Sequence, residues 1–254
     1  MVGYSLWLAT LGLQTWLLIH LLRVGLASRY PFFFGYLAVS WANGSLLWFA
    51  HHNWSPLAYS WAYWSGEFVT VLVGFLLVGE VFRETFRPFP KIRRSVSWLV
   101  LILILLVLAA SVFLQISGLV QHSWQQLFGQ LPRWVRLVQA LLLATLVGVT
   151  RYYYLPLGRN MIGLAAGFGL YTSLAVVGLV FQGLGLVDLP EFGQLYAVAY
   201  VVALGTWSYS LRVYAPNPVP VYRGRLEQDF AHVNALVSST LGEIRGSLRK
   251  ALGT

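Results

Sequence analysis

Two glutamates, Glu67 and Glu80, lie within one long apolar stretch, residues 57 to 85. A charge enclosed in a membrane span costs roughly 3 kcal/mol, so such a carboxylate is by default a functional candidate whose partner must be found. Their separation of thirteen positions corresponds to about 20 Å along a helix and to roughly opposite faces. The two glutamates therefore do not form one catalytic pair.

Glu67 is the first candidate site residue because it is the acidic residue most clearly enclosed within a span. His51 and His52 end the preceding apolar stretch, and they would lie near Glu67 if the two helices are neighbours. We interpret these three residues as a candidate site for a ligand or a proton. The alternative is a carboxylate that hydrogen-bonds to an adjacent helix or is wetted near the outer surface.

Three further polar residues are interpreted as packing residues. His20 lies on the inner third of the first apolar stretch, at a depth similar to that of Glu80, so the two are candidate partners. Asn43 is expected to form a hydrogen bond between helices, because buried amides need partners in lipid.

Several chemistries are excluded by what the sequence lacks. It contains no P-loop, no His-Glu-x-x-His zinc motif and no ordered serine, histidine and acid triad. Retinal needs a lysine inside a span, and the two lysines are Lys91 and Lys250. The absence of cysteine removes thiolate metal sites. We therefore expect no enzymatic activity, no cofactor and no metal.

The composition indicates the membrane as the place where these residues act. The chain is 58% hydrophobic and 10% charged, whereas soluble domains carry about 25% charged residues. Its apolar residues fall into blocks long enough to cross a hydrocarbon core, and prolines precede or begin several of them. This predicts an all-α, multi-pass bundle of about seven transmembrane helices within residues 1–213, over 3–26, 31–51, 57–85, 96–118, 133–155, 159–186 and 191–213.

The basic residues predict an orientation. With the N-terminus outside and the C-terminus in the cytoplasm, fifteen of the seventeen lysines and arginines fall on the cytoplasmic side. Arg133 and Arg136 are the two that fall outside. Because the basic residues flank apolar segments, membrane topology explains the net charge of +9, and we expect no nucleic-acid partner.

The C-terminal region changes character after the last span. A proline-rich link, residues 214–222, precedes a cytoplasmic amphipathic helix over residues 223–254. The polar face of this helix mixes both charge signs, which favours docking on a protein partner or a second protomer over adsorption to the inner leaflet. Its apolar stripe comprises Leu226, Phe230, Val233, Val237, Leu241, Ile244 and Leu248.

Small residues mark a second packing surface. Gly163, Gly167 and Gly169 follow a small-residue pattern in the span 159–186, where helix backbones can approach closely. This face is predicted to pack within the bundle or between protomers. The connection 119–131 is predicted to be a separate short helix in the outer interface.

Two runs of sequence resemble segments of uncharacterised bacterial seven-helix membrane proteins. They are Glu80-Val81-Phe82-Arg83, continued by Phe86-Arg87-Pro88-Phe89-Pro90, and Leu157-Gly158-Arg159-Asn160-Met161-Ile162-Gly163. In layout, such proteins resemble the membrane input modules found near bacterial signalling domains. The resemblance implies a location in the bacterial inner membrane and transfers no site residue.

The leading hypothesis is thus a non-enzymatic sensor or scaffold of the bacterial inner membrane. Short outer loops leave a small or lipid-soluble ligand among the helices as the expected input. The alternatives are an accessory subunit of a respiratory or photosynthetic complex and a small-solute transporter. Beyond the lipid bilayer, the expected partner is a protein or a second copy, bound through the C-terminal helix or the span 159–186.

Overall fold

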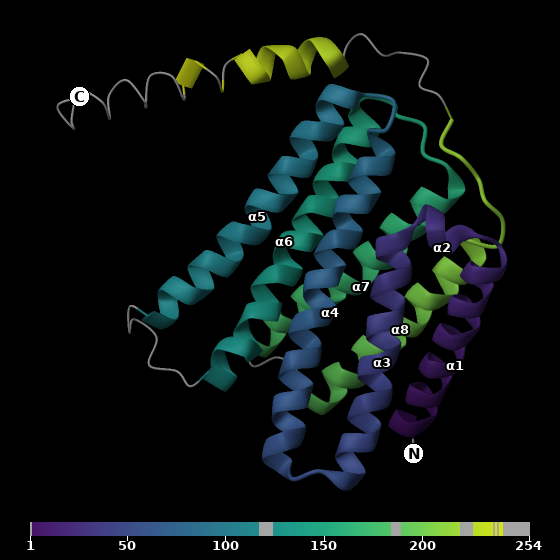
Figure 1. Ribbon diagram of the computed structural model, residues 1–254, viewed down its shortest axis with the longest axis vertical. Helices are drawn as coiled ribbons and strands as arrows, with labels where there is room; N and C mark the ends of the chain where they lie inside the picture. Colours follow the sequence, from purple (N-terminus) through teal and green to yellow (C-terminus); the bar gives the residue numbers. More distant parts are fainter. Residues whose placement is uncertain are drawn as a thin grey trace.

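The computed structural model describes residues 2–116, 124–183, 189–218, 226–235, 237, 239 and 240, and these residues form helices and connections without strands. The all-α prediction is confirmed. The N-terminus lies at one end of the molecule, and the described part of the C-terminal region lies across the other (Figure 1). The helices are α1 (Val2–Arg23), α2 (Leu26–Arg29), α3 (Pro31–Asn53), α4 (Pro56–Thr85), α5 (Pro90–Ile116), α6 (Trp124–Tyr152), α7 (Arg159–Gly183) and α8 (Leu189–Ser210).

Among the described residues, four helices are long and apolar enough to cross a membrane, and this supports a membrane protein. They are α1, α4, α6 and α7, with candidate spans Ser5–Arg23, Pro56–Thr85, Val135–Tyr152 and Arg159–Gly178.

Several element boundaries differ from the sequence predictions; α5, for example, begins at Pro90, six residues before the predicted start. The first helix ends at Arg23 because Gly25 adopts a left-handed conformation, with φ of 73°, and α2 follows as a short separate turn. The predicted interfacial helix 119–131 is replaced by the start of α6, which runs from Trp124 through Pro132 to Tyr152. A proline removes one backbone donor from a helix, and transmembrane helices tolerate this loss. Residues 119–123 lie outside the described residues.

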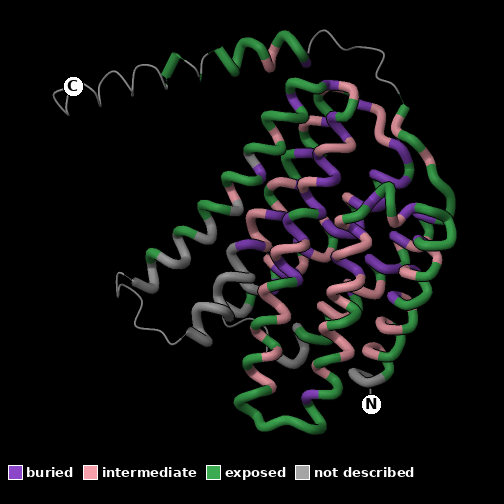
Figure 2. The backbone as a smooth tube through the Cα atoms, in the orientation of Figure 1, coloured by how far each residue is buried: buried purple, intermediate pink, exposed green. Residues whose placement is uncertain are grey.

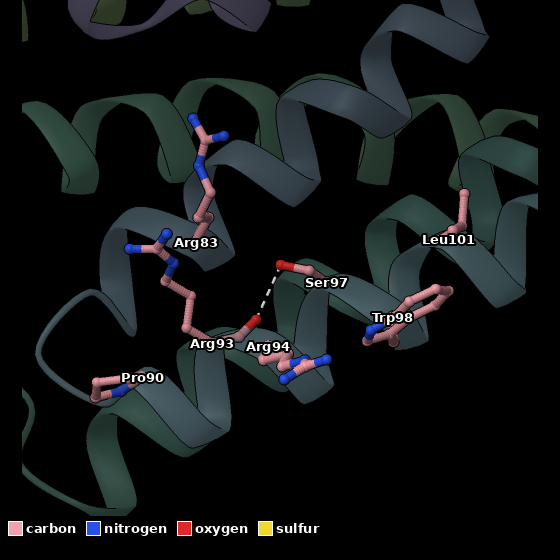
Figure 3. A pocket seen from close by; sticks show the side chains of 7 residues that line it. All are labelled: Arg83, Pro90, Arg93, Arg94, Ser97, Trp98 and Leu101. Atoms are coloured by element: carbon pink, nitrogen blue, oxygen red, sulfur yellow. Dashed lines mark hydrogen bonds between the residues drawn. The ribbon is translucent and has the colours of Figure 1, made fainter.

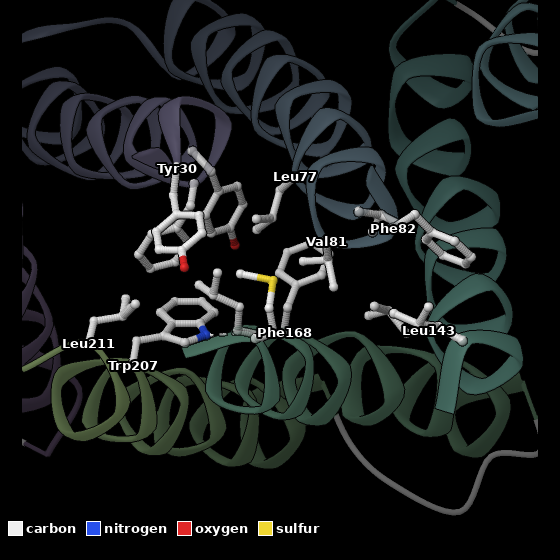
Figure 4. Close-up of a cluster of buried hydrophobic side chains, with 14 of the residues drawn as sticks. Tyr30, Leu77, Val81, Phe82, Leu143, Phe168, Trp207 and Leu211 are labelled. Atoms are coloured by element: carbon white, nitrogen blue, oxygen red, sulfur yellow. Dashed lines mark hydrogen bonds between the residues drawn. The ribbon is translucent and has the colours of Figure 1, made fainter. Parts of the chain in front are cut away.

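The buried core lies toward the end of the bundle that carries the C-terminal region, whereas the opposite end is largely exposed (Figure 2). At its centre the Trp207 indole meets Phe33 edge to face, with ring centroids 5.2 Å apart, and Tyr36 meets Phe168 at 5.3 Å. Figure 4 shows Trp207 and Phe168 within this cluster, together with Leu77 and Val81 of α4. Aromatic pairs in this geometry add to the stabilisation from area burial.

The predicted glycine face is used inside the bundle. A Cβ atom on Gly163 would overlap Ser210, and one on Gly167 would overlap the Trp207 indole, so α7 and α8 approach closely there. A Cβ atom on Gly169 would meet Leu143 at an ordinary 3.9 Å. The face at Gly163 and Gly167 is therefore covered by α8 of the same chain. These two glycines are not available for the predicted contact between protomers.

The proline-rich link is fastened to the bundle over its described residues. Asn217 accepts a hydrogen bond from the Gly158 backbone N–H at 2.7 Å and donates one to the Glu84 carbonyl at 3.1 Å. The fully buried Asn160 accepts a bond from the Ala215 N–H at 2.8 Å. The chain leaving α8 is thus tied to the ends of α4 and α7.

The predicted tail stripe divides into a docked and an exposed part. Leu226 is buried in the main core cluster, Phe230 packs against that cluster, and Tyr153 donates a hydrogen bond to Asp229 at 3.0 Å. Val233 and Val237 are 55% and 51% exposed. The first contacts of the tail are therefore with its own bundle. Leu241, Ile244 and Leu248 lie outside the described residues.

We predict that Gly167→Ala lowers the thermal midpoint of unfolding. The added methyl group must displace a fully buried indole, and overpacking of this kind costs about 1 to 3 kcal/mol. Gly148→Ala is the matched control, because a Cβ atom there meets nothing within 4 Å; it should be neutral or slightly stabilising. Equal midpoints for the two variants would contradict the close approach of α7 and α8.

We predict that Leu226→Ala frees the start of the tail from the bundle, because it removes a buried side chain worth on the order of 2 to 3 kcal/mol. Hydrogen–deuterium exchange of the peptide 226–235 should lose its protection. Val237→Ala is the control and should leave exchange unchanged, since that side chain is exposed. Full protection in the Leu226 variant would show that the docking contact does not hold the tail.

Candidate functional site

The main ionic contact of the bundle interior joins α4 to α6. Arg136 donates a hydrogen bond to the Glu67 carboxylate, and their side chains are 15% and 19% exposed. The guanidinium also lies over the rings of Tyr171 and Tyr196, at 5.7 and 5.2 Å from their centroids. The buried cation is therefore balanced by one carboxylate and two aromatic faces.

Sequence analysis missed Arg136 as the partner of Glu67. It assigned Arg136 to the outer flank of a span, where a basic residue carries little information. The available signal was its place one helical turn before Gln139 on the same apolar segment, because i and i+3 residues share a face. In the structure Gln139 also points inward and donates to the Val71 carbonyl at 2.9 Å.

The tyrosines beside Arg136 continue as a polar aromatic chain. The ring of Tyr171 lies 4.7 Å from that of Tyr196 and 4.9 Å from that of Tyr200. Gln14 donates a hydrogen bond to the Tyr200 hydroxyl at 2.7 Å. This chain connects α7 and α8 to α1, so the surroundings of the ion pair include five helices.

A cavity of about 180 Å³ lies beside this network. Liquid water occupies about 30 Å³ per molecule, so the cavity has room for several waters or for a ligand of a few heavy atoms. Glu67 belongs to its wall, whereas Arg136 does not. The lining residues come from α1, α3, α4, α7 and α8, and they are Trp7, Thr10, Leu11, Gln14, Ser40, Asn43, Gly44, Glu67, Thr70, Tyr171 and Tyr200.

Asn43 gives this wall an unused hydrogen-bond acceptor. Its Oδ1 atom is buried and has no donor in the described part of the chain. The side chain lies directly against Gly66, where any Cβ atom would overlap it, so α3 and α4 approach closely beside the cavity. A buried acceptor without a donor carries a desolvation penalty.

His51 and His52 lie elsewhere. Both are exposed at the end of α3, where the His51 ring packs on Tyr59 at 5.7 Å and His52 Nδ1 lies 2.8 Å from the Trp48 carbonyl. Glu67 lies eleven residues into α4, about 16 Å from the α3–α4 connection. The structure therefore brings Glu67 to Arg136 and Asn43 and leaves the two histidines outside the group.

Glu80 has a separate structural task. It is 1% exposed and accepts hydrogen bonds from the backbone N–H groups of Phe32 and Phe33, at 3.3 and 2.9 Å. These are unpaired donors of the first turn of α3, so a carboxylate of α4 caps the neighbouring helix and complements its dipole. Arg83 lies 3.8 Å from Glu80 as a weaker ionic neighbour.

The suggested pair of His20 and Glu80 is not formed. His20 Nε2 lies 3.2 Å from the Leu211 carbonyl, and the ring stacks on Trp16 at 5.1 Å. His20 contacts Leu211 and Trp16, whereas Glu80 contacts the start of α3. The packing interpretation suits both residues, each with its own partner.

Comparisons with protein-family models, with curated proteins and with solved structures find no match. The resemblance noted for the runs at Glu80 and Leu157 stays a prediction. Within the described ranges, no three His, Asp or Glu side chains gather as metal ligands. The geometry of the site itself is therefore the basis for its interpretation.

We predict that Glu67→Gln and Arg136→Gln each destabilise the bundle, since each leaves its partner buried without a counter-charge. A broken buried pair costs on the order of 3 to 5 kcal/mol. The double variant, Glu67→Gln with Arg136→Gln, should recover much of this loss because two amides can bond to each other. Thermal unfolding in one detergent measures all three, and strictly additive losses would contradict the pairing.

Proposed function

We propose that this protein is a membrane-embedded sensor whose input is a small ligand bound in the cavity beside Glu67. The observation that carries the proposal is the wall of that cavity. It combines the Glu67 carboxylate, which is paired with Arg136 outside the lining, with Asn43, whose buried Oδ1 atom has no donor among the described residues. A packed apolar bundle has no structural need for such a wall.

The wall favours a ligand that donates hydrogen bonds. Glu67 and Asn43 both belong to the lining and both carry acceptor atoms, while the guanidinium that balances Glu67 lies outside the lining. A small protonated amine or an ammonium ion fits the volume and would compete with Arg136 for Glu67, because a charged donor to a carboxylate forms a stronger hydrogen bond than a neutral one. Binding would weaken the hold of Arg136 on Glu67.

The contacts of α4 support a route from this cavity to the other end of the bundle. Glu80 holds the start of α3, and the Glu84 carbonyl accepts a hydrogen bond from Asn217 of the link that leads to the tail. Glu67, Glu80 and Glu84 all belong to α4. A shift of this helix would therefore move the cavity wall and the link together. A helix that responds as one body is the physical element such coupling requires.

The topology belongs to the same proposal. We place seven helices across a bacterial inner membrane, with the N-terminus outside and the tail in the cytoplasm, on the strength of the asymmetry in basic residues. The cavity then lies toward the outer side, and the link and tail lie on the cytoplasmic side. An external solute would bind in the cavity, and the link and tail would respond on the cytoplasmic side.

A tail-labelled protein tests the proposal. Val237→Cys introduces one cysteine into a chain that has none, at an exposed position where a fluorophore disturbs no described contact. In lipid nanodiscs, methylammonium should raise the thermal midpoint and change the tail fluorescence, both saturably. Tetrabutylammonium should do neither, because it is larger and cannot donate a hydrogen bond.

The controls separate the site from general salt effects. Asn43→Ala and the neutral Glu67→Gln, Arg136→Gln double variant should lose both responses. Glu227→Gln removes an exposed carboxylate from the tail and should keep them. Responses that persist in the double variant would overturn the site. Labelling of position 237 from outside intact cells would overturn the orientation.

A further inference from the structure

A groove of about 520 Å³ lies at the tail side of the bundle, between the last turns of α4 and the first three turns of α5. Arg83 of α4 and Arg93 and Arg94 of α5 form its basic part (Figure 3). Ser97, Trp98 and Leu101 continue it along α5, away from the connection. It is separate from the cavity beside Glu67, with which it shares no lining residue.

The groove has an excess of positive charge. No carboxylate belongs to its lining. Arg83 lies 3.8 Å from Glu80, but that carboxylate is already bound by two backbone N–H groups of α3. The Arg93 and Arg94 side chains have no ion pair within the described residues. The groove also adjoins the N-terminus of α5 at Pro90, which adds partial positive charge.

The connection between α4 and α5 fixes the three arginines in place. Phe86 and Phe89 are buried, at 3% and 1% exposure, and the Phe89 N–H bonds to the Phe86 carbonyl at 2.9 Å. The Arg93 N–H bonds to the Phe89 carbonyl at 2.9 Å, so the helix starts directly from this anchored turn. Binding an anion here would order few backbone dihedrals. This lowers the entropic cost of binding.

The surface next to the groove is apolar. Trp98 and Leu101 are 56% and 43% exposed, and Trp98 lies about 12 Å along the helix from Pro90. Tryptophan at such a position is typical of the membrane interface. Further along α5, the outward residues Ile102, Leu105 and Leu106 are also exposed. A ligand that suits the whole surface has an anionic head and an apolar body.

We propose that this groove binds the phosphate of an anionic glycerophospholipid, with an acyl chain lying along α5 past Trp98 and Leu101. Arginine suits this task because its planar guanidinium can bind two phosphate oxygens at once. Basic pockets at the cytoplasmic ends of transmembrane helices are a recurrent form of headgroup recognition. A soluble phosphate would use the arginines but leave the apolar strip uncovered.

Native mass spectrometry of the full chain in detergent tests the proposal, with phosphatidylglycerol and phosphatidylcholine as probes. The protein should bind phosphatidylglycerol more tightly than phosphatidylcholine. Arg93→Gln with Arg94→Gln should weaken phosphatidylglycerol binding by roughly five-fold per arginine, about twenty-five-fold together. Both arginines are exposed, so these changes leave the fold intact, and Arg83 is kept because it also neighbours Glu80.

Arg151→Gln with Arg159→Gln is the matched control. It removes the same charge from exposed positions on the tail side, outside the groove, and it should change binding by no more than about two-fold, because solvent and salt screen distant charges. Equal losses in the two double variants would show diffuse attraction and overturn the site. Glycerol 1-phosphate should compete weakly; binding as tight as that of the lipid would assign the groove to a soluble phosphate instead.

Discussion

The bundle depends on the need to neutralise carboxylates that α4 carries away from water. An isolated buried charge is too costly to persist, so each carboxylate requires a partner from another helix. Glu67 takes Arg136 of α6, and Glu80 takes the open backbone donors of α3. These two contacts fix the rotation of α4 about its axis, since the glutamates lie on roughly opposite faces. The neighbours of α4 are thereby placed on both sides.

The two contacts have different consequences. Glu80 is bound by N–H groups that any helix start would leave open, so its bonds stabilise α3 and need no second side chain. The Glu67 pair needs a cation that is itself buried, and apolar residues of similar volume often replace such pairs without loss of stability. Stability alone therefore does not explain Glu67 and Arg136. The proposed ligand site in the cavity next to them would give the pair a role beyond packing.

Periodicity and composition predicted the all-helical fold, the close approach at Gly163 and Gly167, and Glu67 as an enclosed group, because each is a property of a single segment. The partners were not predictable in the same way. Arg136 meets Glu67 across 69 positions of sequence, and depth alone suggested His20 for Glu80. The tail shows the same limit. Its stripe predicts a helix, but the stripe does not indicate whether Leu226 meets the bundle or a partner, and in the structure Leu226 is buried in the main core cluster.

The two halves of the molecule differ in how they can respond. Around Trp207 the aromatic core is fully buried and close-packed, and such cores move as rigid units because any gap forfeits contacts. Around Glu67 the cavity is lined in part by polar side chains, such as Gln14 and Thr70, that can exchange hydrogen bonds. Under the proposed function, a change there is passed on by the displacement of whole helices, and α4 is the helix that touches the cavity, the α3 start and the Asn217 contact. The groove at Arg83 and Arg93 lies at the end of that same helix. A lipid bound there would oppose or assist the displacement according to which position of α4 it fits better, since a ligand shifts an equilibrium only by its difference in affinity between the two states.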